Sequence, residues 1–186
     1  MAVQIKYPNI GICGLSCRLC PTYHTEGKSR CGGCKSHSRM AVGCPFITCA
    51  IKRKGIEFCW QCPENEVCDK WGKHRAFSQE YDTFTCYQKL DANIVFIQEK
   101  GISAFDKEHK IREKLLKDML VNFNEGRSKR KYCIAATVFR IKELEAALSK
   151  AKLNSAGADI KEKSKMLHSI LGEIAEKKQY TLKLRK

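Results

Sequence analysis

Residues 11–21 read Gly-Ile-Cys-Gly-Leu-Ser-Cys-Arg-Leu-Cys-Pro, and this stretch opens the most cysteine-rich part of the chain. Ten of the twelve cysteines lie between Cys13 and Cys68. The same segment is rich in glycine and in Cys-Pro steps and poor in periodic apolar runs, so it cannot bury much apolar surface. Something other than a hydrophobic core must therefore hold it together, and the cysteines are the candidates.

The first half of this segment contains two C-x2-C pairs that are separated by ten residues: Cys17, Cys20, Cys31 and Cys34. In such a pair a tight turn aims two sulfurs at one ion, and two pairs complete a tetrahedral shell of four thiolates. Gly32 and Gly33 lie inside the second pair, where small residues ease the turn. The spacing predicts a first closed metal site.

The second half of the segment predicts another site, with less certainty about its ligands. Cys59 and Cys62 form a firm pair, and Cys44 and Cys49 most simply supply the other two ligands. Two thiols are then left over, one beside each site, and either could replace a ligand assigned here: Cys13 and Cys68. Spacing does not fix the pairing, and the two sites could interleave.

The chemistry of these cysteines has several interpretations. C-x2-C pairs at this spacing are typical of structural zinc, so we expect about two zinc ions. The alternative is an iron–sulfur redox or radical protein, since Cys13-x3-Cys17-x2-Cys20 has the spacing by which radical enzymes bind a four-iron cluster. Such a motif normally opens a large α/β barrel, whereas more cysteines and then helices follow here. Reduced thiols without metal, and disulfides, are the remaining interpretations.

The motifs in residues 11–21, 31–34 and 54–63 resemble a bacterial and archaeal cysteine-rich family known as domain of unknown function 3795. Its pattern is a CGLxCxxCP start, a CxGC pair and a KGxxxCxxCP segment that closes on another cysteine. All ten cysteines of the segment match, although Val67 stands where the family usually has a proline. The resemblance covers about residues 10–70 and implies metal binding, but it implies no reaction.

From about Trp71 onward the composition changes to long amphipathic stretches. We therefore expect a Cys-rich metal-stabilised module over residues 1–72, irregular and with short ribbons, followed by an all-α domain of four to five helices over residues 73–186. Phe77, Tyr81 and Phe84 have the spacing of a helix that continues to Gly101. A second helix is expected from a capping box at Ser103.

The last part of the chain predicts two more helices and a tail. One helix is expected from about Lys129 to Lys150, and another begins after Asp159, which could cap it. The basic tail over residues 180–186 alternates apolar and polar residues, which predicts a short strand or an extended arm.

The formal net charge of +15 favours polyanionic partners, so we expect nucleic acid or an acidic protein as a possible partner. Ser128 could cap a helix whose N-terminus would suit a phosphate, although a solvated basic turn is the simpler interpretation. The candidate anion-binding residues lie in two short clusters: Arg127, Ser128, Lys129 and Arg130, and Lys52, Arg53 and Lys54. No recognisable nucleic-acid-binding motif is present, and a protein-interaction module is a further alternative.

The sequence identifies no catalytic residue and no small-molecule substrate, so a binding protein is favoured over an enzyme. Cys86 and Cys133 lack a visible activating base and are expected to be core residues. Glu57 is the nearest acidic residue to the candidate ligands, but all-Cys sites are usually closed to catalysis. Residues 1–10 lack a long apolar core and no long apolar run follows, so we expect a cytoplasmic protein without a membrane span. Three histidines lie near the module and could replace a cysteine ligand: His24, His37 and His74.

Overall fold

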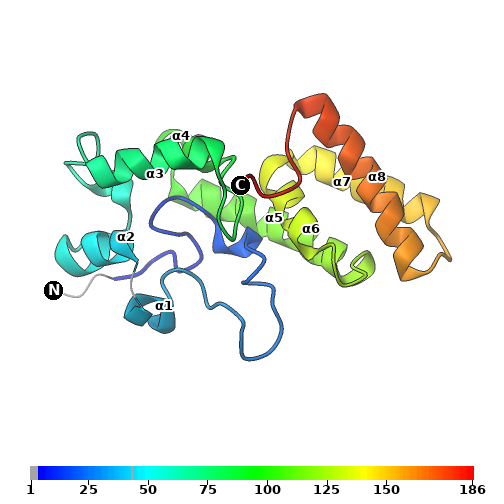
Figure 1. Ribbon diagram of the computed structural model, residues 1–186, viewed down its shortest axis with the longest axis horizontal. Helices are drawn as coiled ribbons and strands as arrows, with labels where there is room; N and C mark the ends of the chain where they lie inside the picture. The colour runs from blue at the N-terminus through cyan, green and yellow to red at the C-terminus, as the bar shows by residue number, and fades with distance from the viewer. Residues whose placement is uncertain (1–3, 43) are drawn as a thin grey trace.

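A computed structural model describes residues 4–42 and 44–186 of the chain. Figure 1 shows the N-terminal third as loops and short turns beside a set of longer helices. No strand occurs in these two ranges, where a single bridge pairs Ile10 with Ser16. The short ribbons expected in the module are therefore wrong. Its regular structure is a series of short helical turns: η1 (Cys17–Leu19), α1 (His37–Val42), α2 (Pro45–Ile47), η2 (Thr48–Arg53) and η3 (Cys59–Gln61).

The cysteine pairs themselves explain why turns replace ribbons. The backbone N–H of Cys20 donates to the carbonyl of Cys17, and that of Cys62 donates to the carbonyl of Cys59, each at 3.1 Å. These two C-x2-C pairs thus each close as one tight turn, which uses locally the hydrogen-bonding groups that a strand would offer to a neighbour. In the third pair the N–H of Cys34 donates to the Cys17 sulfur instead.

The helical domain expected from the sequence is confirmed, but in the described residues it has six helices where four to five were expected. Its helices follow in the order α3 (Asp69–Glu80), α4 (Leu90–Lys100), α5 (Ile102–Asn122), α6 (Lys129–Val138), α7 (Ile141–Asn154) and α8 (Ile160–Lys178). The predicted boundary at residues 72–73 lies inside α3. Asp159 caps α8 as predicted, because its carboxylate accepts a hydrogen bond of 2.9 Å from the N–H of Glu162.

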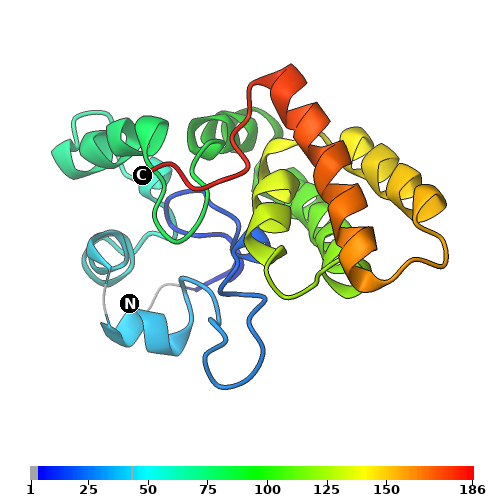
Figure 2. The ribbon, with the colours of Figure 1, turned by 45° about the vertical axis from the view of Figure 1, so that its right-hand side comes forward.

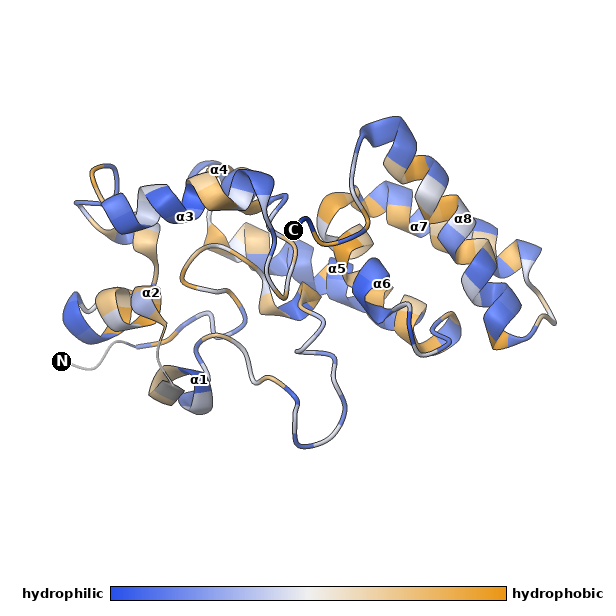
Figure 3. Cartoon of the chain, in the orientation of Figure 1, coloured by the Kyte–Doolittle hydropathy of each residue, from blue (hydrophilic) through white to orange (hydrophobic). Residues whose placement is uncertain are grey.

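One continuous core holds the C-terminal helices together. Leu116 and Met119 on α5, Leu144 on α7 and Leu167 on α8 are fully buried in it. Figure 3 shows the corresponding pattern, with apolar and polar residues on different faces of α7 and α8. Burial of these apolar stripes is what drives the helices together.

Two of the expected helices are interrupted. Phe77, Tyr81 and Phe84 are largely exposed, and the helix that was to carry them ends at Glu80. A loop over residues 81–89 follows before α4. The helix expected over residues 129–150 is likewise split into α6 and α7. At this break Arg112 donates hydrogen bonds to the carbonyls of Ala136 and Phe139, at 2.9 and 2.6 Å, and so satisfies groups that a continuous helix would have bonded internally.

The module is docked onto α5. Leu19 of η1 is buried in the helical core, and the neighbouring Arg18 forms ion pairs with Glu113 at 2.7 Å and Asp106 at 3.4 Å. The loop that contains the first cysteines is thereby fixed against the longest helix of the protein.

The C-terminal residues form an extended arm, the second of the two forms expected for the tail. Figures 1 and 2 show this arm leaving α8 and returning across the molecule toward α3. Arg185 reaches Asp82, which follows the end of α3, with an Nη2–Oδ1 distance of 3.0 Å. The arm therefore ties the end of the chain to the loop over residues 81–89.

Candidate metal centre

Ten cysteines of the module divide between two cavities. The larger has a volume of about 210 Å³ and is lined by six of them: Cys13, Cys17, Cys20, Cys31, Cys34 and Cys44. The smaller has a volume of about 90 Å³ and is lined by the other four: Cys49, Cys59, Cys62 and Cys68. We call these the six-thiol cavity and the four-thiol cavity. Phe46 of α2 lines both and lies between them.

This division agrees with part of the sequence assignment. The four thiols of the first predicted site, Cys17, Cys20, Cys31 and Cys34, line one cavity. Of the second predicted set, Cys44 instead lines the six-thiol cavity, and Cys68 lies with Cys49 and the firm pair. Within residues 4–42 and 44–186, no three His, Cys, Asp or Glu side chains converge on a single-ion site. All twelve cysteines are free thiols. Which thiols are metal ligands remains a prediction.

Cys17 is the centre of the six-thiol group. Its sulfur accepts a hydrogen bond of 3.3 Å from the backbone N–H of Cys34. The Cys34 thiol also donates to it, which lowers the pKa of Cys17 and raises that of Cys34. The charges of Cys20 and Cys13 act on Cys17 as well, so this sulfur interacts with both pairs of the predicted site and with the extra thiol.

Cys13 of the six-thiol cavity lies close enough to Cys59 of the four-thiol cavity for its charge to affect the pKa of Cys59. The pKa of Cys13 is raised to about 12, chiefly by burial, and the nearby thiols of Cys34 and Cys44 contribute to the rise. Burial followed by the charge of Cys13 likewise raises the pKa of Cys59, on the four-thiol side, to about 12. Cys13 therefore lies at the boundary of the two groups.

The backbone approaches the sulfurs closely at two glycines. A Cβ atom at Gly33 would lie 3.5 Å from the Cys17 sulfur, on a backbone with φ of +100° that disfavours other residues. A Cβ atom at Gly11 would lie 3.6 Å from the Cys13 sulfur and 3.8 Å from that of Cys34. These positions leave the space around the sulfurs free of side-chain atoms.

Cations and hydroxyls surround the thiols. A side-chain hydrogen bond with Cys31 raises the pKa of Arg39. The pKa of Lys54 is raised first by Glu64, 2.7 Å away, and then by Cys62. The Thr22 hydroxyl lies 3.1 Å from the Cys20 sulfur. Positive charge and hydrogen-bond donors stabilise thiolates, the form in which cysteine binds metal.

Two polar atoms in the wall of the six-thiol cavity are buried without a hydrogen-bond partner in the part of the chain that the structure describes. They are the Ser16 hydroxyl oxygen and the His74 Nε2 atom. Burial lowers the pKa of His74. Buried polar groups are normally paired, so these two groups are exceptions within one cavity wall.

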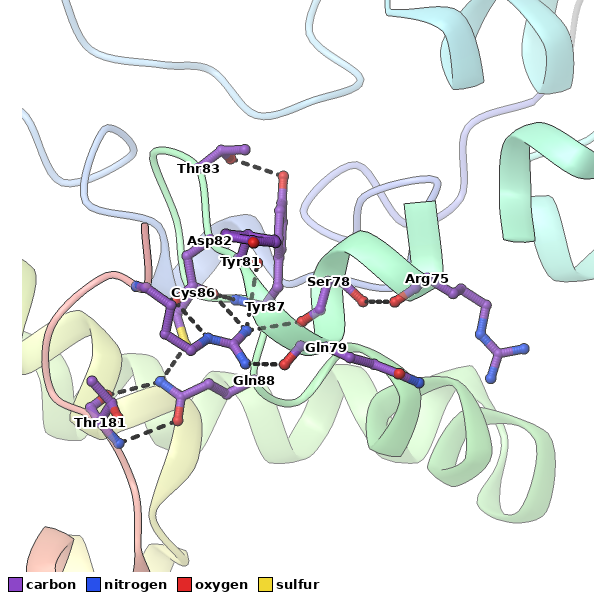
Figure 4. A network of polar contacts seen from close by, with 11 residues as sticks. Arg75, Ser78, Gln79, Tyr81, Asp82, Thr83, Cys86, Tyr87, Gln88 and Thr181 are labelled. Carbon is purple, nitrogen blue, oxygen red and sulfur yellow. Dashed lines mark hydrogen bonds and ion pairs between the residues drawn. The ribbon is translucent and has the colours of Figure 1, made fainter. Parts of the chain in front are cut away.

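The loop over residues 81–89 forms one wall of the six-thiol cavity through Phe84, Thr85 and Tyr87. The fully buried Asp82 carboxylate holds this loop, because it accepts a hydrogen bond from the N–H of Tyr87. Figure 4 shows the contacts around it.

Arg185 locks the same carboxylate from the C-terminal arm. Its backbone N–H and its Nε atom donate to Asp82 at 2.9 and 3.1 Å. The guanidinium also donates to the carbonyls of Ser78 and Gln79 at the end of α3. Although burial acts to raise the pKa of Asp82, these hydrogen bonds lower it below its usual range. We call this contact the Asp82–Arg185 latch. Local sequence patterns could not predict it, because the two residues are about a hundred positions apart.

A buried ion pair joins the turns on which the two thiol groups are built. Lys35, next to Cys34, has a fully buried side chain and lies 2.7 Å from the carboxylate of Glu57, two residues before Cys59. Glu57 also accepts from the N–H of Tyr7 at 2.9 Å. The position that the sequence offered as the nearest acid is thus an ion-pair partner and lines neither cavity.

The other two thiols, Cys86 and Cys133, line neither cavity. Cys86 and Cys133 are buried in the helical core, as expected, and burial raises the pKa of both. His24 Nε2 lies 2.6 Å from the carbonyl oxygen of Arg18, and His37 is exposed on α1. Of the three histidines considered as ligands, His74 alone lines a cavity described here.

The candidate anion-binding residues are not brought together. Lys52, Arg53 and Lys54 follow α2, whereas residues 127–130 lie at the start of α6, toward the other end of the molecule in Figures 1 and 2. The Ser128 hydroxyl bonds the Glu125 carboxylate and lies 2.6 Å from His168 Nε2, so it is engaged within the protein. A nucleic-acid partner stays a prediction.

No helix in the described part of the chain is long and apolar enough to cross a membrane. Residues 9–73 match the profile of a family described as Protein of unknown function (DUF3795), which is the family that the sequence resembles. The match ends inside α3, and the later helices lie outside it. No curated protein and no solved structure matches the chain.

Proposed function

We propose that this DUF3795 segment is a metal-binding module with two separate thiolate centres. The observation that carries the proposal is the division of all ten module cysteines between two neighbouring cavities. A reduced thiol is usually an isolated core residue, as Cys133 is in the helical domain. Groups of six and of four, surrounded by donors and cations, instead have the composition of metal–thiolate sites.

The four-thiol cavity fits a structural zinc ion. Four thiolates complete the tetrahedral shell that zinc prefers and leave no open position for a substrate. Its ligands would be the two pairs of the second group: Cys49 with Cys68, and Cys59 with Cys62. Asn65 donates a hydrogen bond of 3.2 Å to the carbonyl of Trp60 and so stabilises the turn that carries Cys59 and Cys62. Lys54 adds positive charge near Cys62.

This function is that of a metal-stabilised scaffold. The bound metals would hold the module in the shape that Arg18 and Leu19 fix against α5. Outside the module, Cys86 and Cys133 are buried in the helical core with raised pKa values, which does not favour a nucleophilic thiol.

Anaerobic purification followed by elemental analysis tests the proposal. Metal bound in both centres is expected in the unmodified chain. Cys49→Ser should lose about one zinc per chain, since three thiolates do not complete the shell. Cys133→Ser is the matched control, because this thiol lies outside both cavities and should leave the metal content unchanged. A chain that carries no transition metal in any preparation would contradict the proposal.

A further inference from the structure

We infer that the six-thiol cavity holds an iron–sulfur cluster, bound by four of its six thiolates and hydrogen-bonded by Ser16 and His74. The inference rests on the proposed two-centre metal binding and adds the chemical nature of the larger centre. Three observations carry it: the space, the unpartnered donors and the placement of the first three cysteines.

The space exceeds what one ion needs. Zinc lies about 2.3 Å from each of its four sulfurs, so a closed zinc site has no room for other atoms. One water molecule needs roughly 10–15 Å³ of such a cavity. The six-thiol cavity measures about 210 Å³, against about 90 Å³ for its neighbour. It therefore has room for an inorganic core of several metal and sulfide ions.

The two unpartnered groups belong to residues that line the same cavity. The Ser16 hydroxyl and the His74 imidazole are buried in the cavity wall, and neither has a hydrogen-bond partner among the described residues. Inorganic sulfides and cysteine sulfurs of a cluster are hydrogen-bond acceptors, and such bonds tune the reduction potential of the cluster. A metal–sulfide core would satisfy both donors, and Thr22 and the N–H of Cys34 already serve individual cysteine sulfurs.

The first three cysteines of the module line the same cavity. Cys13, Cys17 and Cys20 all lie in the wall of the six-thiol cavity, so the C-x3-C-x2-C run places its three cysteines around one space. Gly11 and Gly33 keep the nearby backbone free of side-chain atoms. Ile12, Ile47 and the aromatic side chains of the lining give the cavity apolar surroundings, which limit the access of water.

The test is anaerobic reconstitution of the full chain with ferrous iron and sulfide, followed by assays of iron, acid-labile sulfide and zinc. We expect about four iron and four sulfide ions per chain, with visible charge-transfer absorption, and about one zinc ion. Cys17→Ser should lose iron and sulfide while keeping zinc. Cys68→Ser, the matched variant in the other cavity, should lose zinc while keeping iron and sulfide.

The outcomes separate this inference from the proposed function. Zinc in both centres without labile sulfide would overturn the cluster and leave the two-centre metal binding intact. No metal in either centre would overturn both.

The roles of Ser16 and His74 can be tested separately from cluster binding. Ser16→Ala and His74→Phe each remove a hydrogen-bond donor, so the reconstituted cluster should have a more negative reduction potential, measured by redox titration with electron paramagnetic resonance. Ser78→Ala is the control, because this buried hydroxyl donates to the Arg75 carbonyl and does not line the cavity. Unchanged potentials in both cavity variants would overturn the assignment of these two donors.

Discussion

The thiol module and the helical domain differ in how their apolar side chains are packed. The helices bury one continuous apolar core that contains side chains such as Leu116, Tyr132 and Leu167 with no exposed surface. The module has small clusters instead, one around Ile12 and Ile47 and another in which Ile10 and Phe58 pack with Ile97 of α4 and Phe105 of α5. Apolar burial within the module is therefore limited, and we propose that bound metal supplies further stability.

The contacts between the two regions are also of two kinds. Leu19 contributes apolar surface to the helical core, whereas Arg18 contributes ion pairs to α5. The Asp82–Arg185 latch fastens the wall of the six-thiol cavity to the C-terminal arm. The two regions are thus distinct in what stabilises them but joined in space, and the predictions below change one while observing the other.

Removal of metal should have the largest effect. Structural zinc contributes about 10–16 kcal/mol in zinc-finger peptides at neutral pH, so a chelator under anaerobic conditions should unfold much of the module. Hydrogen exchange read by mass spectrometry should show lost protection over residues 9–68 and retained protection in α5 to α8. Equal loss in both regions, or no loss in either, would count against a metal-held module.

The Lys35–Glu57 pair should come next. Lys35→Met leaves a buried carboxylate without its partner, which typically costs about 3–5 kcal/mol. Urea unfolding should show this loss, with weaker zinc retention because the pair joins the turns of the two centres. The double variant Lys35→Met/Glu57→Gln removes the unpaired charge and should recover part of the stability. No recovery would mean that packing of Lys35 over the Phe58 ring, 3.7 Å from its centroid, matters more than the charge.

A cavity in the helical core should destabilise the protein without affecting the metal. Leu116→Ala removes a fully buried side chain from α5 and should cost about 3 kcal/mol in the free energy of unfolding. Thermal unfolding measures the loss, and elemental analysis should give the same metal content as the unmodified chain. Metal lost in proportion to stability would indicate that the two regions unfold as one unit.

The smallest of these effects is expected at the latch. Arg185→Ala should cost about 1–3 kcal/mol, since it removes charge-assisted hydrogen bonds from a buried carboxylate. The folded pKa of Asp82 is lowered, so its contribution is present above the unfolded pKa of about 4 and is lost as the pH falls through the folded value.

The stability difference between Arg185→Ala and the unmodified chain should therefore shrink on acidification below about pH 4. Release of metal from the six-thiol cavity to a chelator should be faster in the variant, because its wall is no longer held. A difference that is constant with pH would show that Asp82 is not the group concerned.

The sequence predicted what local pattern controls. The cysteine pairs, the cap at Asp159 and the amphipathic faces of α5 and α8 follow from spacing alone, and the structure contains them. The break between α6 and α7 depends on Arg112, which lies on another helix. The loop over residues 81–89 depends on Arg185 at the far end of the chain. Distant partners of this kind leave no periodic signal.

The cysteine assignment shows the same limit. Counting from the nearest pair places Cys44 with Cys49, but α2 begins between them, and its residue Phe46 lines both cavities. Cys68 precedes α3 directly, and the turn from Cys62 to Cys68 returns it to the four-thiol group. Only the path of the chain decides which thiols share a cavity.

The most direct test of the central claim, the division into six and four thiols, is the metal content of Cys44→Ser beside that of Cys68→Ser, both purified anaerobically. The account predicts that Cys68→Ser loses about one zinc per chain and that Cys44→Ser keeps it. Loss of this zinc in Cys44→Ser and its retention in Cys68→Ser would contradict the division.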